Sequence, residues 1–174
     1  YLSVILPFFL FLGFRALSPC ALAGEVGTVH ADAKSAIELG EVFPDFTVET
    51  TEGTFSLSEE LKDHEAVLLV FWASWCPPCY EEFPYIQKMA DALKDQVRVI
   101  ALSIEDTDSM ELIADYGKEL GLTIPLGRDE DHLYACTSQE GYPTPVLIDR
   151  YGCVSYMKAG SLPSEEAAFT LVSA

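Results

Sequence analysis

An apolar run that passes directly into a helical pattern constrains this chain more than any other feature. The segment Val70–Pro84 reads VFWASWCPPCYEEFP, and two cysteines, Cys76 and Cys79, lie where the pattern changes. The run Ala66–Trp72 is continuously apolar, as expected of a strand that is covered on both faces of a sheet. A cysteine pair at such a junction is a disulfide staple, half of a metal site or a redox centre.

The chemistry of the pair favours the redox centre. At a helix N-terminus, unpaired backbone N–H groups and the helix dipole stabilise a thiolate, so Cys76 is the expected nucleophile and Cys79 the resolving thiol. Pro77 suits a first helical turn because its missing N–H would have no intrahelical partner, and Pro78 stiffens the short ring. A structural zinc site needs four ligands, but no second Cys-x-x-Cys is present and the histidines are isolated. A staple over so short a loop would stabilise little.

Length and charge limit the remaining possibilities. A chain of 174 residues with 49% hydrophobic content is long enough for one domain with a substantial core but short for two. The formal net charge of −18 argues against a nucleic-acid backbone or an anionic membrane surface as a partner. We therefore expect one globular domain with no nucleic-acid partner. We also expect the protein to be a monomer.

The beginning of the chain has the pattern of an export signal. Residues 1–23 form an apolar stretch that ends in the A-x-A sequence Ala21–Ala23, and we expect cleavage there. An uncleaved anchor, or a lipid on Cys20, is the alternative. Residues 24–40 lack periodicity and are interpreted as a linker, which leaves residues 41–174 for the domain. Export implies a periplasmic or other extracytoplasmic compartment in which disulfides persist.

Strand and helix signals alternate along the rest of the chain, and this alternation predicts an α/β domain. The expected elements, in chain order, are a hairpin from Phe46 to Leu57 that turns at Gly53, the strand Ala66–Trp72, a helix from Pro77 to Leu93, the strand Val97–Ile104, a helix capped by Asp108 and Glu111 and ended by Gly121, a short strand Thr123–Leu126, a helical turn Asp131–Thr137, a second hairpin that turns at Arg150–Gly152, and a final helix from Ser164.

Three quoted motifs resemble the thioredoxin superfamily. They are FWASWCPPC, the EEFP that follows it, and the later GYPTPVLIDRYG, and together with the FPDF entry segment they look like the exported TlpA/ResA-like branch. The resemblance covers about Val42 to Phe169. It implies a thioredoxin fold, with a mixed central sheet flanked by helices and the first hairpin as an N-terminal extension. It also implies thiol–disulfide exchange outside the cytoplasm, with the Cys76–Cys79 disulfide in place of a cofactor.

The resemblance also assigns roles to individual residues. Pro143 matches the cis-proline that, in the family, lies against the disulfide and exposes the backbone of the preceding residue, here Tyr142, to a substrate chain. Thioredoxins proper carry a buried acid where this chain has Val70. In the ResA-like branch a glutamate one turn after the second cysteine has a similar role, and Glu82 occupies that position here. Glu81, the neighbouring residue, is the alternative. A carboxyl near a buried thiol would have a raised pKa and could relay its proton. The residues expected to contact substrate are Trp75, Pro77, Pro78, Tyr142 and Thr144.

Three residues depart from the family pattern. Pro145 removes a backbone donor from a strand that the fold places inside the sheet, so pairing there must be irregular or leave that position unpaired. Cys136 and Cys153 have no counterpart in the family pattern. They could pair with each other, but we expect two unpaired, partly buried thiols.

Several functions remain open at this point. The leading interpretation is a reductant that takes electrons from a membrane thiol reductase and reduces protein disulfides, as similar proteins do in cytochrome c maturation or copper-site assembly. A disulfide-forming oxidant is the second, since the reduction potentials of the superfamily span a wide range. A metallochaperone that holds Cu(I) through the two soft thiolates is the third. A peroxidase is disfavoured because the threonine before a lone cysteine is missing.

Overall fold

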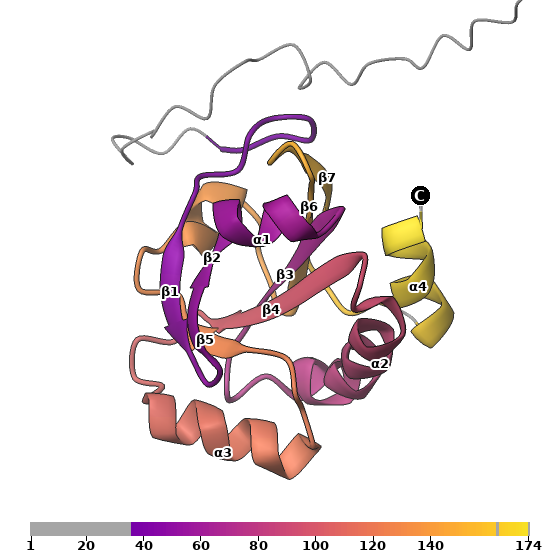
Figure 1. The fold of residues 1–174 in the computed structure, drawn as a ribbon. Coiled ribbons are helices and arrows are strands. Elements are labelled where there is room, and N and C mark those ends of the chain that lie inside the picture. Colours follow the sequence, from indigo (N-terminus) through magenta and orange to yellow (C-terminus); the bar gives the residue numbers. More distant parts are fainter. Residues whose placement is uncertain (1–35, 163, 174) are drawn as a thin grey trace, which may run out of the picture.

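The computed structural model describes residues 36–162 and 164–173 (Figure 1). The expected signal, residues 1–23, and most of the expected linker lie outside the described residues. The described residues form β1 (Thr47–Thr50), β2 (Gly53–Ser56), α1 (Leu57–Asp63), β3 (Ala66–Trp72), α2 (Pro77–Leu93), β4 (Val97–Ser103), α3 (Met110–Leu120), β5 (Leu126–Arg128), the 3₁₀ helix η2 (Leu133–Thr137), β6 (Thr144–Asp149), β7 (Val154–Met157) and α4 (Glu165–Ser173). Within this part of the chain, no helix combines the length and the apolar character needed to cross a membrane.

The sheet is mixed, which confirms the predicted thioredoxin-like α/β fold. Its seven strands have the order β2-β1-β5-β4-β3-β6-β7. The strands β3, β4 and β5 are parallel, whereas β6 runs antiparallel to β3 and β7 antiparallel to β6. The hairpin β1–β2 joins the sheet beside β5, so it extends the sheet at one edge as expected.

Side chains of β3 point alternately to the two faces of the sheet, and both faces are covered. Leu68, Val70 and Trp72 pack into one hydrophobic cluster together with residues of α2, α3 and α4. Val67, Leu69 and Phe71 pack into the other, with residues of α1, η2 and the segment before β1. Because every residue of this strand after the first is buried, its continuous apolar run is required by the packing. Figure 1 shows β3 and β4 crossing the centre of the domain, with α2 beside α4.

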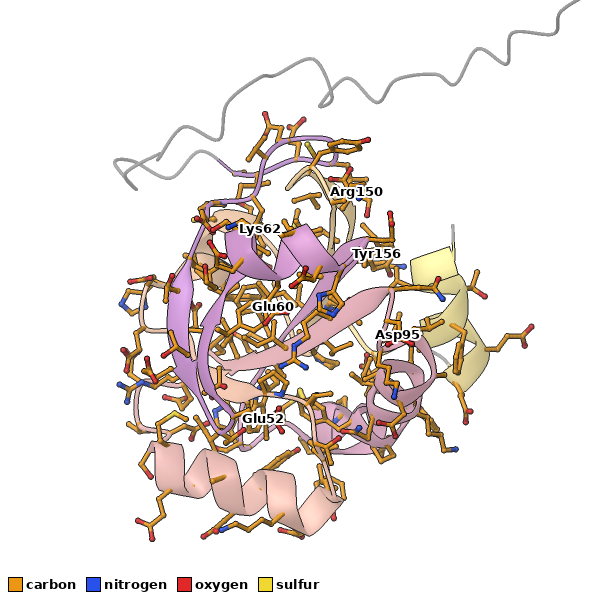
Figure 2. The ribbon with its side chains drawn as sticks, viewed as in Figure 1. Glu52, Glu60, Lys62, Asp95, Arg150 and Tyr156 are labelled. Carbon is orange, nitrogen blue, oxygen red and sulfur yellow. A yellow bond between two sulfur atoms is a disulfide. The ribbon has the colours of Figure 1, made fainter. Side chains whose placement is uncertain are left out.

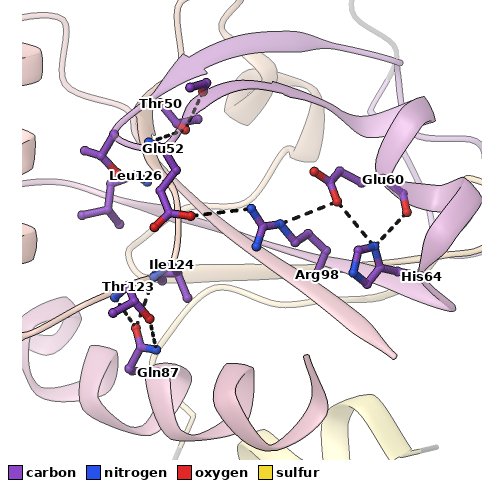
Figure 3. A network of polar contacts seen from close by, with 11 residues as sticks. Thr50, Glu52, Glu60, His64, Gln87, Arg98, Thr123, Ile124 and Leu126 are labelled. Carbon is purple, nitrogen blue, oxygen red and sulfur yellow. Dashed lines mark hydrogen bonds and ion pairs between the residues drawn. The ribbon is translucent and has the colours of Figure 1, made fainter. Parts of the chain in front are cut away.

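Two of the differences between the predicted and the observed elements concern α1 and β5. The helix α1 was not predicted, because the alternating pattern of the hairpin was carried on to Leu57, which in fact begins the helix. The strand β5 begins at Leu126 and not at Thr123. Gln87 of α2 accepts hydrogen bonds from the backbone N–H groups of Thr123 and Ile124, at 2.7 and 3.3 Å, and so replaces strand pairing there (Figure 3).

A second correction concerns the start of α3. Asp108 was expected to cap this helix, but the cap is Ser109, whose hydroxyl accepts from the Leu112 N–H at 3.2 Å. The carboxylate of Asp108 points elsewhere, toward the end of β3, and is described with the site below. Gly121 ends the helix as predicted, in the left-handed conformation that glycine adopts without steric cost.

Charged side chains tie the hairpin and α1 to β4. Arg98 lies between Glu52 and Glu60, with N–O distances of 3.9 and 3.6 Å, and His64 contacts the same Glu60 carboxylate at 3.4 Å (Figure 3). Elsewhere the charged groups spread over the surface, as Lys62, Asp95 and Arg150 illustrate in Figure 2, which also shows the side chains around the sheet and helices.

The structure accommodates the three residues that depart from the family pattern in different ways. Pro145 lies opposite Val70 in the pairing of β6 with β3 and has no partner in β7, whose ladder covers Val146–Ile148. The missing backbone donor therefore falls where β6 extends beyond β7, as anticipated. Cys153 is buried and belongs to a disulfide, so the expectation of an unpaired thiol is wrong at this position. Cys136 is half-buried in η2.

Candidate active site

The Cys76–Cys79 disulfide lies at the junction of β3 and α2. Cys76 is the N-cap of α2, and its sulfur accepts a hydrogen bond from the Cys79 N–H at 3.3 Å. Both cysteines are almost fully buried, whereas Pro77 and Pro78, which occupy the first two helical positions, are exposed. Because the two prolines have no N–H, the backbone donor that the first helical turn directs at the Cys76 sulfur is the Cys79 N–H, and together with the helix dipole it stabilises a thiolate once the disulfide is reduced.

Glu82 lies one turn further along α2 and is also buried, with 3% of its surface exposed. Residues three apart on a helix share a face, with about 5–6 Å between their Cβ atoms, so Glu82 follows Cys79 into the interior. Neither carboxyl oxygen has a hydrogen-bond partner of normal geometry among the described residues. Burial raises the pKa of Glu82 to about 7, and the backbone amide of Leu162 offsets only part of this rise. The rival Glu81 is exposed.

The peptide bond between Tyr142 and Pro143 is cis, and the loop that carries it is fixed by Tyr134. The phenol O–H of Tyr134 donates toward the carbonyls of Gln139 and Gly141, at 2.9 and 3.1 Å, and its oxygen accepts from the Gly141 N–H at 3.2 Å. The ring of Tyr134 packs against that of Tyr142, with centroids 5.0 Å apart. The position of the cis-proline loop is thus set by a side chain of η2.

Trp75 joins the cysteine turn to the cis-proline loop. Its ring meets that of Tyr142 edge to face, with centroids 5.8 Å apart, and its indole N–H donates to the Glu105 carboxylate at 2.8 Å. Although held in this way, Trp75 keeps 59% of its surface exposed. Trp72, by contrast, is fully buried and packs on Phe83, as expected of a core residue. An exposed aromatic ring beside the disulfide offers an apolar contact surface for another molecule.

Most of the residues predicted for the site come together in this region. The exposed or partly exposed ones are Trp75, Pro77, Pro78 and Tyr142, and the buried ones are Cys76, Cys79, Glu82, Pro143 and Thr144. Thr144 differs from its expected role as a substrate contact, because its side chain is fully buried and its hydroxyl donates to the Gly141 carbonyl at 2.7 Å. It supports the loop from inside.

Sequence reasoning missed a group of polar residues next to the cysteine turn. Asp108, with 3% of its surface exposed, accepts hydrogen bonds from the Ser74 hydroxyl at 2.7 Å, the Ser103 hydroxyl at 2.6 Å and the Ser74 N–H at 3.3 Å. A usable signal was present: Ser103 ends β4 and Ser74 lies two residues after the end of the parallel strand β3, and the carboxyl ends of parallel strands share one edge of a sheet. The described residues contain no cluster of three or more metal-ligating side chains.

A thioredoxin-like domain with a Cys-Pro-Pro-Cys disulfide at the start of a helix defines the class of the thiol–disulfide oxidoreductases. Comparison with known proteins agrees. The sequence matches the Redoxin family over residues 38–171. It is 32% identical over 160 residues to the thiol–disulfide oxidoreductase ResA of Bacillus thuringiensis, which covers 88% of this chain and 90% of ResA. It is 29% identical over 138 residues to the thioredoxin-like protein YneN of Bacillus subtilis, covering 79% of this chain and 81% of YneN.

A solved structure gives the same result. The crystal structure of a putative thiol:disulfide interchange protein DsbE from Chlorobium tepidum superposes with a TM-score of 0.69 at 27% identity, over 79% of this chain and 96% of that protein. The chain belongs to the Redoxin family, and within it to the ResA-like thiol–disulfide oxidoreductases, as the sequence motifs indicated.

Proposed function

We propose that this protein is an extracytoplasmic reductant that transfers electrons to the disulfides of client proteins through Cys76 and Cys79. The observation that supports the proposal most strongly is the burial, one helical turn from the resolving cysteine, of the Glu82 carboxyl, which has no hydrogen-bond partner of normal geometry among the described residues. Such a group exchanges a proton near neutral pH, and the second step of disulfide reduction requires a proton acceptor at that position.

The first step is nucleophilic attack by Cys76. The thiolate of Cys76 attacks one sulfur of a client disulfide, the client S–S bond breaks, and a mixed disulfide forms while the other client sulfur leaves as a thiolate. The N-terminus of α2 favours the attacking thiolate. The client chain is proposed to lie along the backbone of Tyr142 and against the exposed ring of Trp75.

The second step resolves the mixed disulfide. The thiol of Cys79 gives its proton to the Glu82 carboxylate, and the resulting thiolate attacks the sulfur of Cys76. The bond between Cys76 and the client breaks, and the second client sulfur leaves as a thiolate. Two electrons have then passed to the client, which is a dithiol after protonation, and Cys76–Cys79 is a disulfide again.

Location, donor and clients are also part of the proposal. The signal-like residues 1–23 support export to the periplasm or an equivalent compartment. There the disulfide would be returned to the dithiol by a membrane thiol reductase, and the clients would be the cysteine pairs of cytochrome c maturation or copper-site assembly. The protein would act as a monomer.

The test is the equilibrium reduction potential of the Cys76–Cys79 pair, measured by titration against glutathione or dithiothreitol with thiol trapping. A potential near or below that of thioredoxin, about −270 mV, is expected of a reductant. A potential near that of DsbA, about −120 mV, would reverse the direction and make disulfide formation the function. Stoichiometric Cu(I) binding by the reduced pair, with little exchange activity, would instead indicate a metallochaperone.

The role of Glu82 has its own test. The rate of mixed-disulfide resolution should rise with pH through about 7 in the wild-type protein, because only the carboxylate accepts a proton. In the Glu82→Gln variant this rise should disappear, whereas Glu81→Gln, a change of the exposed neighbour, should keep the wild-type profile. An unchanged profile in Glu82→Gln would exclude the relay.

A further inference from the structure

The buried carboxylate of Asp108 has no part in the exchange chemistry described so far, yet it contacts the turn that carries Cys76. We propose that Asp108 is a positioning residue for disulfide exchange, which fixes the Ser74–Cys76 turn against the end of β4 and so keeps Cys76 within reach of Cys79 in the dithiol form. The inference rests on the exchange reaction proposed above.

The geometry of the two strands brings these segments together. Trp72 and Ser103 are partners in the parallel pairing of β3 with β4 and are the last residues of those strands. The next residue, Ile104, still donates its N–H to the Trp72 carbonyl at 2.9 Å. The loop after β4 therefore leaves the sheet alongside the cysteine turn, and Asp108 closes it by donating its N–H to the Glu105 carbonyl at 3.0 Å.

The carboxylate then holds the cysteine turn at two points. One oxygen of Asp108 accepts from the Ser74 hydroxyl, and the other accepts from the Ser74 backbone N–H and from the Ser103 hydroxyl. Hydrogen bonds to an ionised acceptor are roughly twice as strong as neutral ones, and burial excludes competing water. The next residue is held by the same loop, since the Trp75 indole N–H donates to the Glu105 carboxylate.

The consequence differs between the two redox forms. In the disulfide, the bond to Cys79 already fixes Cys76. In the dithiol that bond is absent. The position of Cys76 then depends on its backbone hydrogen bonds, among them that of its N–H to the Ala73 carbonyl at 3.1 Å, and on the contacts of Ser74 with Asp108. Loosening the turn would give the dithiol more conformations and lower the effective concentration of one thiol at the other. The equilibrium of ring closure should therefore depend on Asp108.

The experiment measures the equilibrium constant of the dithiol with oxidised glutathione, which yields the protein disulfide and two molecules of reduced glutathione. Asp108→Ala should lower this constant by about threefold or more, because the loosened turn gives the dithiol conformations that ring closure must remove. Asp108→Asn should restore most of the loss, since a flipped amide accepts from the Ser74 N–H and Ser103 with its oxygen and donates to the Ser74 hydroxyl. Asp106→Ala, the loss of an exposed carboxylate in the same loop, is the matched control and should equal the wild type.

A second variant keeps the proposal testable if Asp108→Ala does not fold. Ser74→Ala removes one contact and should lower the constant in the same direction, and adding it to Asp108→Ala should lower it little further because both act through one contact. If Ser74→Ala matches Asp106→Ala, or if Asp108→Ala loses thermal stability at an unchanged constant, the positioning role is excluded. The equilibrium needs no client protein, so this failure is distinguishable from a failure of the proposed reductase function.

Discussion

Glu82 follows Cys79 by three residues on one buried face of α2, so a carboxyl without a hydrogen-bond partner of normal geometry among the described residues lies next to the resolving cysteine. A buried carboxyl of this kind destabilises a fold when it is ionised. Because the group is retained in the core, its cost should be measurable as a dependence of stability on pH.

The first prediction concerns that dependence. The pKa of Glu82 is about 7 in the folded protein, raised from an ordinary value of 4.5 by burial. The folded state therefore binds the proton more tightly than the unfolded state, and this group lowers the free energy of unfolding as pH rises from about 4.5 through 7. Relative to the wild type, Glu82→Gln should gain stability over that window, by up to about 3 kcal/mol above pH 8.

Urea unfolding of the oxidised protein at pH 5 and at pH 9 measures this difference. Glu81→Gln is the control, because Glu81 is exposed on the same helix. A gain of equal size at both pH values would show that the substitution acts through packing and not through ionisation.

The second prediction concerns client binding. Trp75 is exposed beside the disulfide and contacts Tyr142 and Glu105. Trp75→Ala should lower kcat/KM for a protein disulfide about tenfold, as removal of an aromatic anchor does at interfaces, with the loss mainly in KM. Reaction with a small aromatic disulfide should change less than about twofold because it needs no such contact. Equal losses for both substrates would mean that Trp75 acts on the cysteines themselves.

Most of the fold was predictable from local patterns, but the error at the start of β5 has a non-local cause. The continuous apolar run of β3 and the helical spacing along α2 are strong signals, and both elements have the expected boundaries. The start of β5 could not be predicted, because Gln87 from a distant helix takes the backbone donors of Thr123 and Ile124. A side chain that replaces strand pairing in this way does not change the hydrophobic periodicity of the sequence.

The candidate site likewise has a part that could be predicted from sequence and a part that could not. Cys76, Cys79 and Glu82 are close in sequence and belong to the start of one helix, so their relative positions could be predicted from the sequence motif alone. Asp108 is 34 residues from its partner Ser74, and its sequence neighbourhood equally fits a helix cap, a role that Ser109 fills. Where a side chain has both a local and a distant use, only the packed structure decides between them.

The third prediction concerns the support of the cis-proline loop. The phenol group of Tyr134 makes three hydrogen bonds to the backbone of Gln139 and Gly141. Tyr134→Phe should lower the free energy of unfolding by about 1–2 kcal/mol, because it leaves loop backbone groups without their partner. It should also slow exchange with a protein disulfide, since the loop that carries Tyr142 becomes less ordered.

Urea unfolding and single-turnover exchange measure the two effects of that substitution. Tyr151→Phe removes the same hydroxyl from an exposed position and should change neither quantity. If exchange slows equally in both variants, the loop contact is not responsible.

The fourth prediction concerns the attachment of the N-terminal hairpin, which joins the sheet through the pairing of β1 with β5 at Gly127. A Cβ at Gly127 would lie 2.9 Å from the backbone oxygen of Glu49 and 3.1 Å from the Leu102 side chain. Because the oxygen belongs to a paired strand and cannot move alone, Gly127→Ala should separate the strands and cost about 1–3 kcal/mol of unfolding free energy.

Gly117→Ala is the informative comparison, since its added Cβ meets only the end of the flexible Leu126 side chain, at 2.7 Å. Urea unfolding should rank Gly127→Ala as the more damaging change, and hydrogen exchange should show lost protection in β1; the reverse ranking would mean that the hairpin adjusts freely.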